Sequence, residues 1–233
     1  MPNNTLISSR AEARAITNTF LRSVYNWMAL GLGLTGVVSY LFFPYVETFI
    51  IQYGMTPIFV LMAIELGLVF FLSARVGKLS GTAATASFLV YSALNGITLT
   101  PLLYAYTSAS LAGAFISTAA MFASVSIYGL VTKRDLSGVG SFCFMGLIGM
   151  IVAMIVNMFL MSGVLNLVVN LVGVVVFVGL TAYDTQKLKE MGEMVPQDDP
   201  TAVRRGTIMG ALALYLNFIN LFIIMLQLLG DRR

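Results

Sequence analysis

Residues 141–160 read SFCFMGLIGMIVAMIVNMFL, twenty consecutive positions without one charged side chain. A helix of that length rises about 30 Å, which matches the hydrocarbon thickness of a lipid bilayer. Windows of the same kind recur along the chain and predict seven spans, at 24–43, 56–74, 82–104, 109–131, 141–160, 164–184 and 207–229. The sequence therefore predicts an all-α membrane protein, a bundle of seven transmembrane helices.

The composition supports lipid as the main solvent of this chain. Of the 233 residues, 58% are hydrophobic and 10% charged, and the mean hydropathy is +0.90. Soluble domains have about 45–50% apolar and about 25% charged residues. One cysteine and no histidine exclude an intrachain disulfide, a His/Cys zinc site and a histidine-based catalytic triad. We therefore expect no enzymatic activity and no cofactor.

The basic residues predict the orientation in the membrane rather than a nucleic-acid partner. They form no clustered patch, so we expect no nucleic-acid binding. With the N-terminus in the cytoplasm, 11 of the 13 lie in inner segments: Arg10, Arg14, Arg22, Arg75, Lys78, Lys133, Arg134, Lys187, Lys189, Arg204 and Arg205. Only Arg232 and Arg233, after the last span, lie on the outer side, although a re-entrant last segment would bring them back inside.

The same count sets the expected domain organisation. Residues 1–23 form a cytoplasmic N-terminal segment, and residues 24–230 form the seven-helix transmembrane domain. The polar stretch 185–206 is its longest internal connection, and its four basic residues place it in the cytoplasm.

Glu65 is the only charged residue near the middle of a predicted span. An ionisable residue inside the membrane costs about 2.5–3.5 kcal/mol or more on insertion scales, so such residues usually serve a function. Two interpretations remain open: a hydrogen-bonded packing residue, or a carboxylate that faces a water-filled ion pathway. Arg75 lies ten residues further on, about 15 Å along the helix, and serves as an interfacial anchor on the simplest interpretation.

The last two spans each carry a stripe of small and polar residues at helical spacing. On the last span the stripe contains Gly206, Gly210, Ala213, Asn217, Asn220, Ile224 and Gln227, and on the sixth Gly163, Asn166, Asn170, Gly173, Phe177, Leu180 and Asp184. Small residues let helices approach closely, and amides hydrogen-bond across the contact. The pattern predicts that the last helix turns this stripe toward the centre of the bundle. Asp184 could equally be an interfacial residue paired with Lys187, three positions on.

Several motifs resemble those of one known family. YDTQ at 183–186 and ALYLNFINLF at 213–222 are the most specific, and ELGLVF at 65–70, NGITL at 95–99 and KRDLS at 133–137 add to them. Together they resemble the transmembrane Bax-inhibitor motif family, in particular its bacterial inner-membrane members. The resemblance covers nearly the whole chain.

The resemblance implies a pH-sensitive calcium leak with a central last helix. In the family, an aspartate at the Asp184 position shares a proton with a second aspartate on the last helix, and an arginine near the Arg75 position locks the pair. Here Asn217 stands at the second position. The like-charge pair is absent, so we expect a pH response altered from the family's and weak around neutrality.

Three classes of function follow from these residues. The first is a calcium or cation conductance, in which Glu65, Asp184 and Asn220 lie on the ion pathway, Glu65 and Asp184 bind calcium, and Asp184, Asn217 and Arg75 form the gate and pH sensor. The second is a non-conducting regulator that binds other membrane proteins or stress and proteolysis factors. The third, an intramembrane aspartyl protease, lacks the second aspartate that its chemistry requires.

Overall fold

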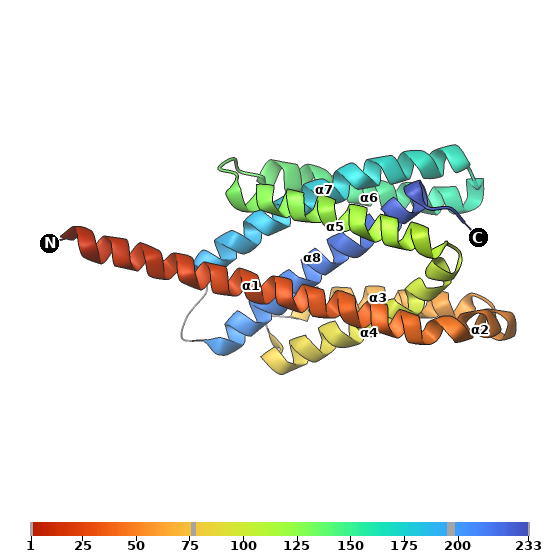
Figure 1. The fold of residues 1–233 in the computed structure, drawn as a ribbon, viewed down its shortest axis with the longest axis horizontal. Helices are drawn as coiled ribbons and strands as arrows, with labels where there is room; N and C mark the ends of the chain where they lie inside the picture. Colours follow the sequence, from red (N-terminus) through yellow and green to blue (C-terminus); the bar gives the residue numbers. More distant parts are fainter. Residues whose placement is uncertain (1, 76–77, 195–198, 233) are drawn as a thin grey trace. The chain divides into compact units, whose positions relative to one another are not determined.

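The computed structural model describes residues 2–75, 78–194 and 199–232, with side chains from Arg14 onward. Its described residues fold into helices without a named strand (Figure 1). The elements are α1 (Pro2–Phe42), a 3-10 turn η1 (Phe43–Tyr45), α2 (Val46–Tyr53), α3 (Thr56–Arg75), α4 (Gly81–Tyr104), α5 (Ser108–Val131), α6 (Ser137–Leu160), α7 (Gly163–Met194) and α8 (Pro200–Leu229). Seven helical segments are long and apolar enough to cross a membrane, as the sequence predicted.

Hydropathy placed several helix ends wrongly. The connection predicted at 185–206 is helical at 185–194, where α7 continues, and at 200–206, where α8 has already begun. α1 runs from Pro2 through the predicted N-terminal segment 1–23 into the first span, and the break at 44–55 contains α2. The cytoplasmic location of 1–23 stays a prediction. Helices continue beyond the apolar windows because backbone hydrogen bonding does not stop where lipid does.

Short polar side chains and left-handed backbone conformations define several helix ends. The Ser80 and Thr107 side chains accept hydrogen bonds from the backbone N–H groups of Ala83 and Ser110, at the starts of α4 and α5. At the end of α6, Met161 adopts a left-handed conformation with φ 50°. These caps satisfy backbone groups that have no partner inside the helix.

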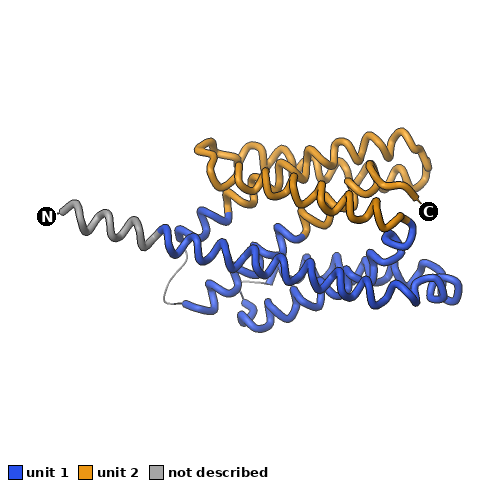
Figure 2. The backbone as a smooth tube through the Cα atoms, viewed as in Figure 1, with its two compact units in different colours: residues 1–105, 188–215 blue, residues 106–187, 216–233 orange. Residues whose placement is uncertain are grey.

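The chain divides into two compact units (Figure 2). Unit 1 contains residues 1–105 and 188–215, and unit 2 contains residues 106–187 and 216–233. Both α7 and α8 therefore contribute one part to each unit. α8 has 61% of its apolar window buried, against 17–39% for the other six segments. Its position at the centre of the bundle stays a prediction.

In unit 1, α1 packs closely against α4. A Cβ added to Gly31 would lie 2.5 Å from the Phe88 ring, and one added to Gly96 would lie 2.7 Å from the Thr35 carbonyl oxygen. Both glycines thus let two helices approach at a distance that a larger residue would prevent. The other side of α4 packs against α3.

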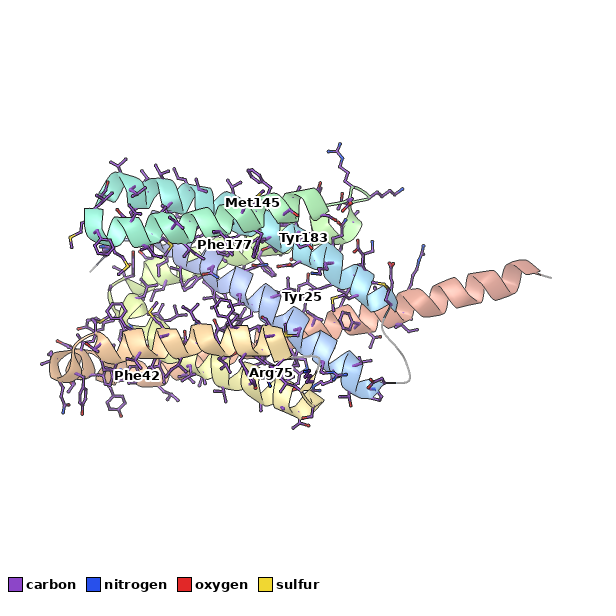
Figure 3. The ribbon with its side chains drawn as sticks, turned by 180° about the vertical axis from the view of Figure 1, so that it is seen from behind. Tyr25, Phe42, Arg75, Met145, Phe177 and Tyr183 are labelled. Atoms are coloured by element: carbon purple, nitrogen blue, oxygen red, sulfur yellow. The ribbon has the colours of Figure 1, made fainter. Side chains whose placement is uncertain are left out.

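In unit 2, the second half of α5 and the first half of α6 pack against α7. A Cβ on Gly129 of α5 would lie 2.5 Å from the Ala182 carbonyl oxygen, and one on Gly140 of α6 would lie 2.5 Å from the Tyr183 ring. Figure 3 labels Tyr183 and Phe177, both on α7. The close contacts fix the part of α7 that carries the YDTQ motif.

The C-terminal tail is attached to the connection between α4 and α5. The Thr107 backbone N–H donates to the Asp231 carbonyl oxygen over 3.2 Å, and the Asp231 N–H donates to the Ser110 hydroxyl over 2.9 Å. The Arg232 guanidinium lies 5.8 Å from the centre of the Tyr106 ring. The tail and residues 106–107 therefore share one end of unit 2, which favours a complete crossing by the last helix over a re-entrant one.

Candidate functional site

A carboxylate and an amide meet inside unit 2. The Asn217 side-chain Nδ2 donates a hydrogen bond of 2.7 Å to Oδ2 of Asp184. Asn217 is 5% exposed, and Asp184 is partly buried. A hydrogen bond this short from an amide to a carboxylate is of the strong, charge-assisted kind when the carboxylate is ionised.

The extended helices explain how the two side chains reach the same level. Asp184 looked terminal in the sequence, but α7 continues ten residues beyond it to Met194, about 15 Å. Asn217 lies 17 residues into α8, about 26 Å from its start at Pro200. Both residues therefore lie well inside their helices, and the pair is part of the packed interior of unit 2.

Lys187, the partner that the i, i+3 spacing suggested for Asp184, forms no ion pair with it within 4 Å. Its Nζ lies 5.7 Å from the centre of the Tyr183 ring, and its side chain is exposed. Between described residues, the structure shows an ion pair only for Arg205 and Asp199. Asp184 is therefore bound by the amide of Asn217 rather than by a lysine.

The YDTQ motif also holds the connection before α6. Oε1 of Gln186 accepts a 2.8 Å hydrogen bond from the Leu136 backbone N–H, and Nε2 of Gln186 donates over 2.9 Å to the Arg134 carbonyl. In the same connection, hydrogen bonds from the Ser137 hydroxyl and then from its backbone N–H lower the pKa of Asp135. The YDTQ and KRDLS motifs are therefore joined by hydrogen bonds.

Three hydroxyl groups in unit 2 are buried without a hydrogen-bond partner in the described ranges: Thr118 and Ser126 of α5 and Thr185 of α7. Thr118 and Ser126 share a helix face with Gly129, which contacts Thr185. The Phe122 ring, between them on that face, packs against Phe218 of α8 at 5.5 Å. The three oxygen atoms are enclosed by the protein, and an unsatisfied buried hydroxyl costs about 1–3 kcal/mol.

A second buried carboxylate lies in unit 1. Glu65 of α3 is 7% exposed. Its Oε1 accepts from the Thr98 hydroxyl over 2.9 Å, and its Oε2 accepts from the Asn95 amide over 3.3 Å. Both donors belong to the NGITL motif of α4, so Glu65 faces the protein rather than lipid, as the cost of its charge required.

The Glu65 cluster continues into α8 through Tyr215. The Tyr215 hydroxyl donates to Oδ1 of Asn95 over 3.2 Å and shares a 2.7 Å hydrogen bond with the Thr35 hydroxyl. The Thr35 hydroxyl also lies 2.8 Å from the Ser92 carbonyl oxygen, so its one proton serves either the tyrosine or this carbonyl. Tyr215 lies within the ALYLNFINLF motif, but its role could not be predicted from the sequence motif alone. The signal was a tyrosine within an otherwise apolar run, whose hydroxyl needs a partner when buried.

The remaining predicted site residues, Arg75 and Asn220, lie outside the two carboxylate clusters. Arg75, labelled in Figure 3, is exposed at the C-terminal end of α3 in unit 1. Asp184 and Asn217 belong to unit 2. The Asn220 amide donates to the Leu216 carbonyl of its own helix over 2.8 Å. Glu65 and Asp184 lie in different units, and no group of three or more His, Cys, Asp or Glu side chains suited to a metal ion occurs among the described residues. Their roles as lock, pathway and calcium ligands stay predictions.

Most of the polar stripes lie inside the protein. On α8 all seven members of the predicted stripe are buried or half-buried. On α7 the stripe is buried or half-buried from Asn170 to Asp184, but its first two members, Gly163 and Asn166, are exposed. The seven candidate spans define a multi-pass membrane protein. Its helices enclose the two carboxylate clusters, at Asp184 and at Glu65.

Comparison with known proteins identifies the family. The family model for the inhibitor of apoptosis-promoting Bax1 matches residues 17–233. The chain is 45% identical to the inner membrane protein YbhL of Escherichia coli K12, over 97% of both chains. It is also 42% identical to an uncharacterized protein of Borreliella burgdorferi over 94% of both chains, and 41% identical to one of Deinococcus radiodurans over 92% of this chain and 91% of that protein. The chain belongs to the Bax inhibitor family of membrane proteins.

Proposed function

We propose that this protein is a calcium or cation leak pathway of the bacterial inner membrane, gated where Asn217 binds Asp184. The observation that carries the proposal is the 2.7 Å hydrogen bond between these two side chains. It occupies the position at which the family resemblance implies a pair of aspartates. The proposal assigns no catalytic step and no resident cofactor to the chain.

Oxygen atoms inside the helices supply the chemistry for a hard cation. Calcium is bound in proteins by carboxylate, amide, carbonyl and water oxygens. Unit 2 contains the Asp184 carboxylate and the buried hydroxyls of Thr118, Ser126 and Thr185, which have no hydrogen-bond partner among the described residues. Unit 1 offers Glu65, whose carboxylate is bound by one amide and one hydroxyl. A path through a bilayer needs such groups because lipid provides none.

The Asn217 amide supports a gate that responds weakly to pH. While the amide donates to Asp184, one carboxylate oxygen is engaged and the two helices are tied together. The amide carries no titratable proton, so this closed arrangement does not depend on a shared proton as a pair of aspartates does. Opening then requires the hydrogen bond to break, by helix movement or by competition from a cation.

The location follows from the relative and from the charges. YbhL is an inner membrane protein by name, and its identity to this chain extends over 97% of both sequences. The excess of Lys and Arg in the connections predicted to be internal favours a cytoplasmic N-terminus. The attached tail at residues 231–232 then lies on the periplasmic side, together with residues 106–107.

Calcium flux in proteoliposomes tests the proposal. The purified protein is reconstituted into vesicles that enclose a calcium dye, and influx is compared with that of protein-free vesicles. Asp184→Ala should change influx, whereas Asp135→Ala, which removes an exposed carboxylate from the connection before α6, should not. Influx no greater than that of protein-free vesicles would contradict the proposal and favour the non-conducting regulator.

A further inference from the structure

A cavity of about 990 Å³ opens in unit 1 where α4 and α8 begin. Six of its lining residues carry hydroxyl groups: Ser23, Ser80, Thr82, Thr85, Thr201 and Thr207. Among the described residues that line it, Arg204 is the charged one and none is an aspartate or glutamate. The combination of one cation with several hydroxyl donors suits an anion.

The Arg204 side chain of α8 is held in place by two neighbouring helices, α1 and α4. Its Nε donates to the Thr85 hydroxyl over 3.0 Å, and its Cζ lies 4.5 Å from the centre of the Trp27 ring of α1. Gly81 makes room for the stem, because a Cβ there would lie 2.9 Å from Cγ of Arg204. These contacts therefore fix the position of the Arg204 guanidinium in the lining of the cavity.

The rest of the guanidinium remains available. Only Nε has a hydrogen-bond partner in the described part of the chain, so the two terminal amino groups keep their N–H donors. Their fork geometry matches two oxygens of a phosphate group. The neighbouring acid does not compete, since Asp199 pairs with Arg205 at 3.9 Å and accepts from the first N–H groups of α8.

The cavity also has an apolar side. Ala86 and Leu89 line it further along α4, and Leu89 lies eight residues, about 12 Å, beyond Gly81. In the predicted orientation, α4 runs from the cytoplasmic surface toward the membrane centre, so the apolar lining follows the acyl-chain region below the polar lining. A phospholipid has the same order of groups, with a polar headgroup at the membrane surface and apolar acyl chains below it.

We infer that the cavity binds an anionic phospholipid of the cytoplasmic leaflet, with its phosphate at Arg204 and the start of one acyl chain along Ala86 and Leu89. Charge complementarity favours an anionic over a zwitterionic headgroup, because the lining adds one positive charge and no negative charge. This inference does not depend on cation conduction.

Trp27 gives a direct readout, because it is the single tryptophan of the chain and contacts Arg204. The full-length protein is reconstituted into phosphatidylcholine vesicles that contain either brominated phosphatidylglycerol or brominated phosphatidylcholine, at equal mole fractions. Bromine quenches tryptophan fluorescence at short range, so quenching reports lipid beside Trp27. We expect stronger quenching by the glycerol lipid, and Arg204→Gln should reduce that preference about fivefold.

Arg205→Gln is the matched control, since Arg205 is the next residue and does not line the cavity. It should leave the preference unchanged. Arg204→Lys, which keeps the charge but not the fork, should retain part of the preference, and a thermal melt of each variant confirms folding. Equal quenching by both lipids, or an equal loss in both glutamine variants, would overturn the inference.

A competition arm separates the lipid from a free phosphate. Inorganic phosphate and glycerol 3-phosphate at millimolar concentration should not restore the fluorescence of the wild-type protein quenched by phosphatidylglycerol. Restoration by either would assign the Arg204 site to a soluble phosphate and refute the lipid assignment.

Discussion

Replacing Asn217 with alanine tests the pair in unit 2 by stability. The change removes the 2.7 Å hydrogen bond to Asp184 and leaves that carboxylate without its amide donor in a largely buried position. A hydrogen bond to a charged group contributes about 1.5–3 kcal/mol to the free energy of unfolding. For a chain of this size, a loss of about 2 kcal/mol lowers the melting temperature by about 4–8 °C. The assay is a thermal melt of the purified protein in detergent.

Asn220 provides the matched control, three residues further along the same helix. Among the described residues its amide donates to the Leu216 carbonyl alone, which is part of the α8 backbone. Asn220→Ala should therefore cost less than about 1 kcal/mol. Equal melting temperatures for the two alanine variants would refute the view that Asn217 is a structural partner of Asp184.

Three further predictions test the packing of α6 against α7, the role of the Tyr215 hydroxyl in unit 1 and the topology. Gly140→Ala should destabilise the protein by about 1–3 kcal/mol, because its Cβ would meet the Tyr183 ring, whereas Gly138→Ala should be neutral or stabilising in the same melt, because nothing lies within 4 Å of that position. Tyr215→Phe should cost about 1–3 kcal/mol by removing the donor to Oδ1 of the buried Asn95 side chain, and an unchanged melt would exclude a structural role for this hydroxyl. A reporter fused after the last residue should read periplasmic, like one at residues 106–107, and opposite readings would contradict the attachment of the tail.

The seven spans could be predicted from the sequence because lipid imposes one requirement, about twenty apolar residues, on every span. Helix ends could not, since nothing in hydropathy stops α7 at Asp184. The residues after it include Lys187 and Lys189, which are compatible with a helix that continues into water. Both stripes followed from periodicity, but the exposure of Gly163 and Asn166 depends on where neighbouring helices end.

For the site, the sequence indicated the residues more fully than their partners. The cost of a charge in lipid singled out Glu65, and the family resemblance paired Asp184 with Asn217. That Glu65 is bound by Thr98 and Asn95 depends on the register between α3 and α4, which no single-helix pattern contains. The same holds for Arg204, whose role arises only where Trp27, Gly81 and Thr85 meet.

The central claim, a cation path gated by Asp184 and Asn217, is tested most directly by calcium influx between pH 5 and pH 8 in wild-type and Asn217→Asp proteoliposomes. The side chains meet at 2.7 Å, so the variant places two carboxyl groups within the range at which one of them retains a proton. The account predicts measurable wild-type influx that varies little with pH around neutrality and a steeper response in Asn217→Asp. Superimposable influx curves for the two folded and active proteins would contradict it.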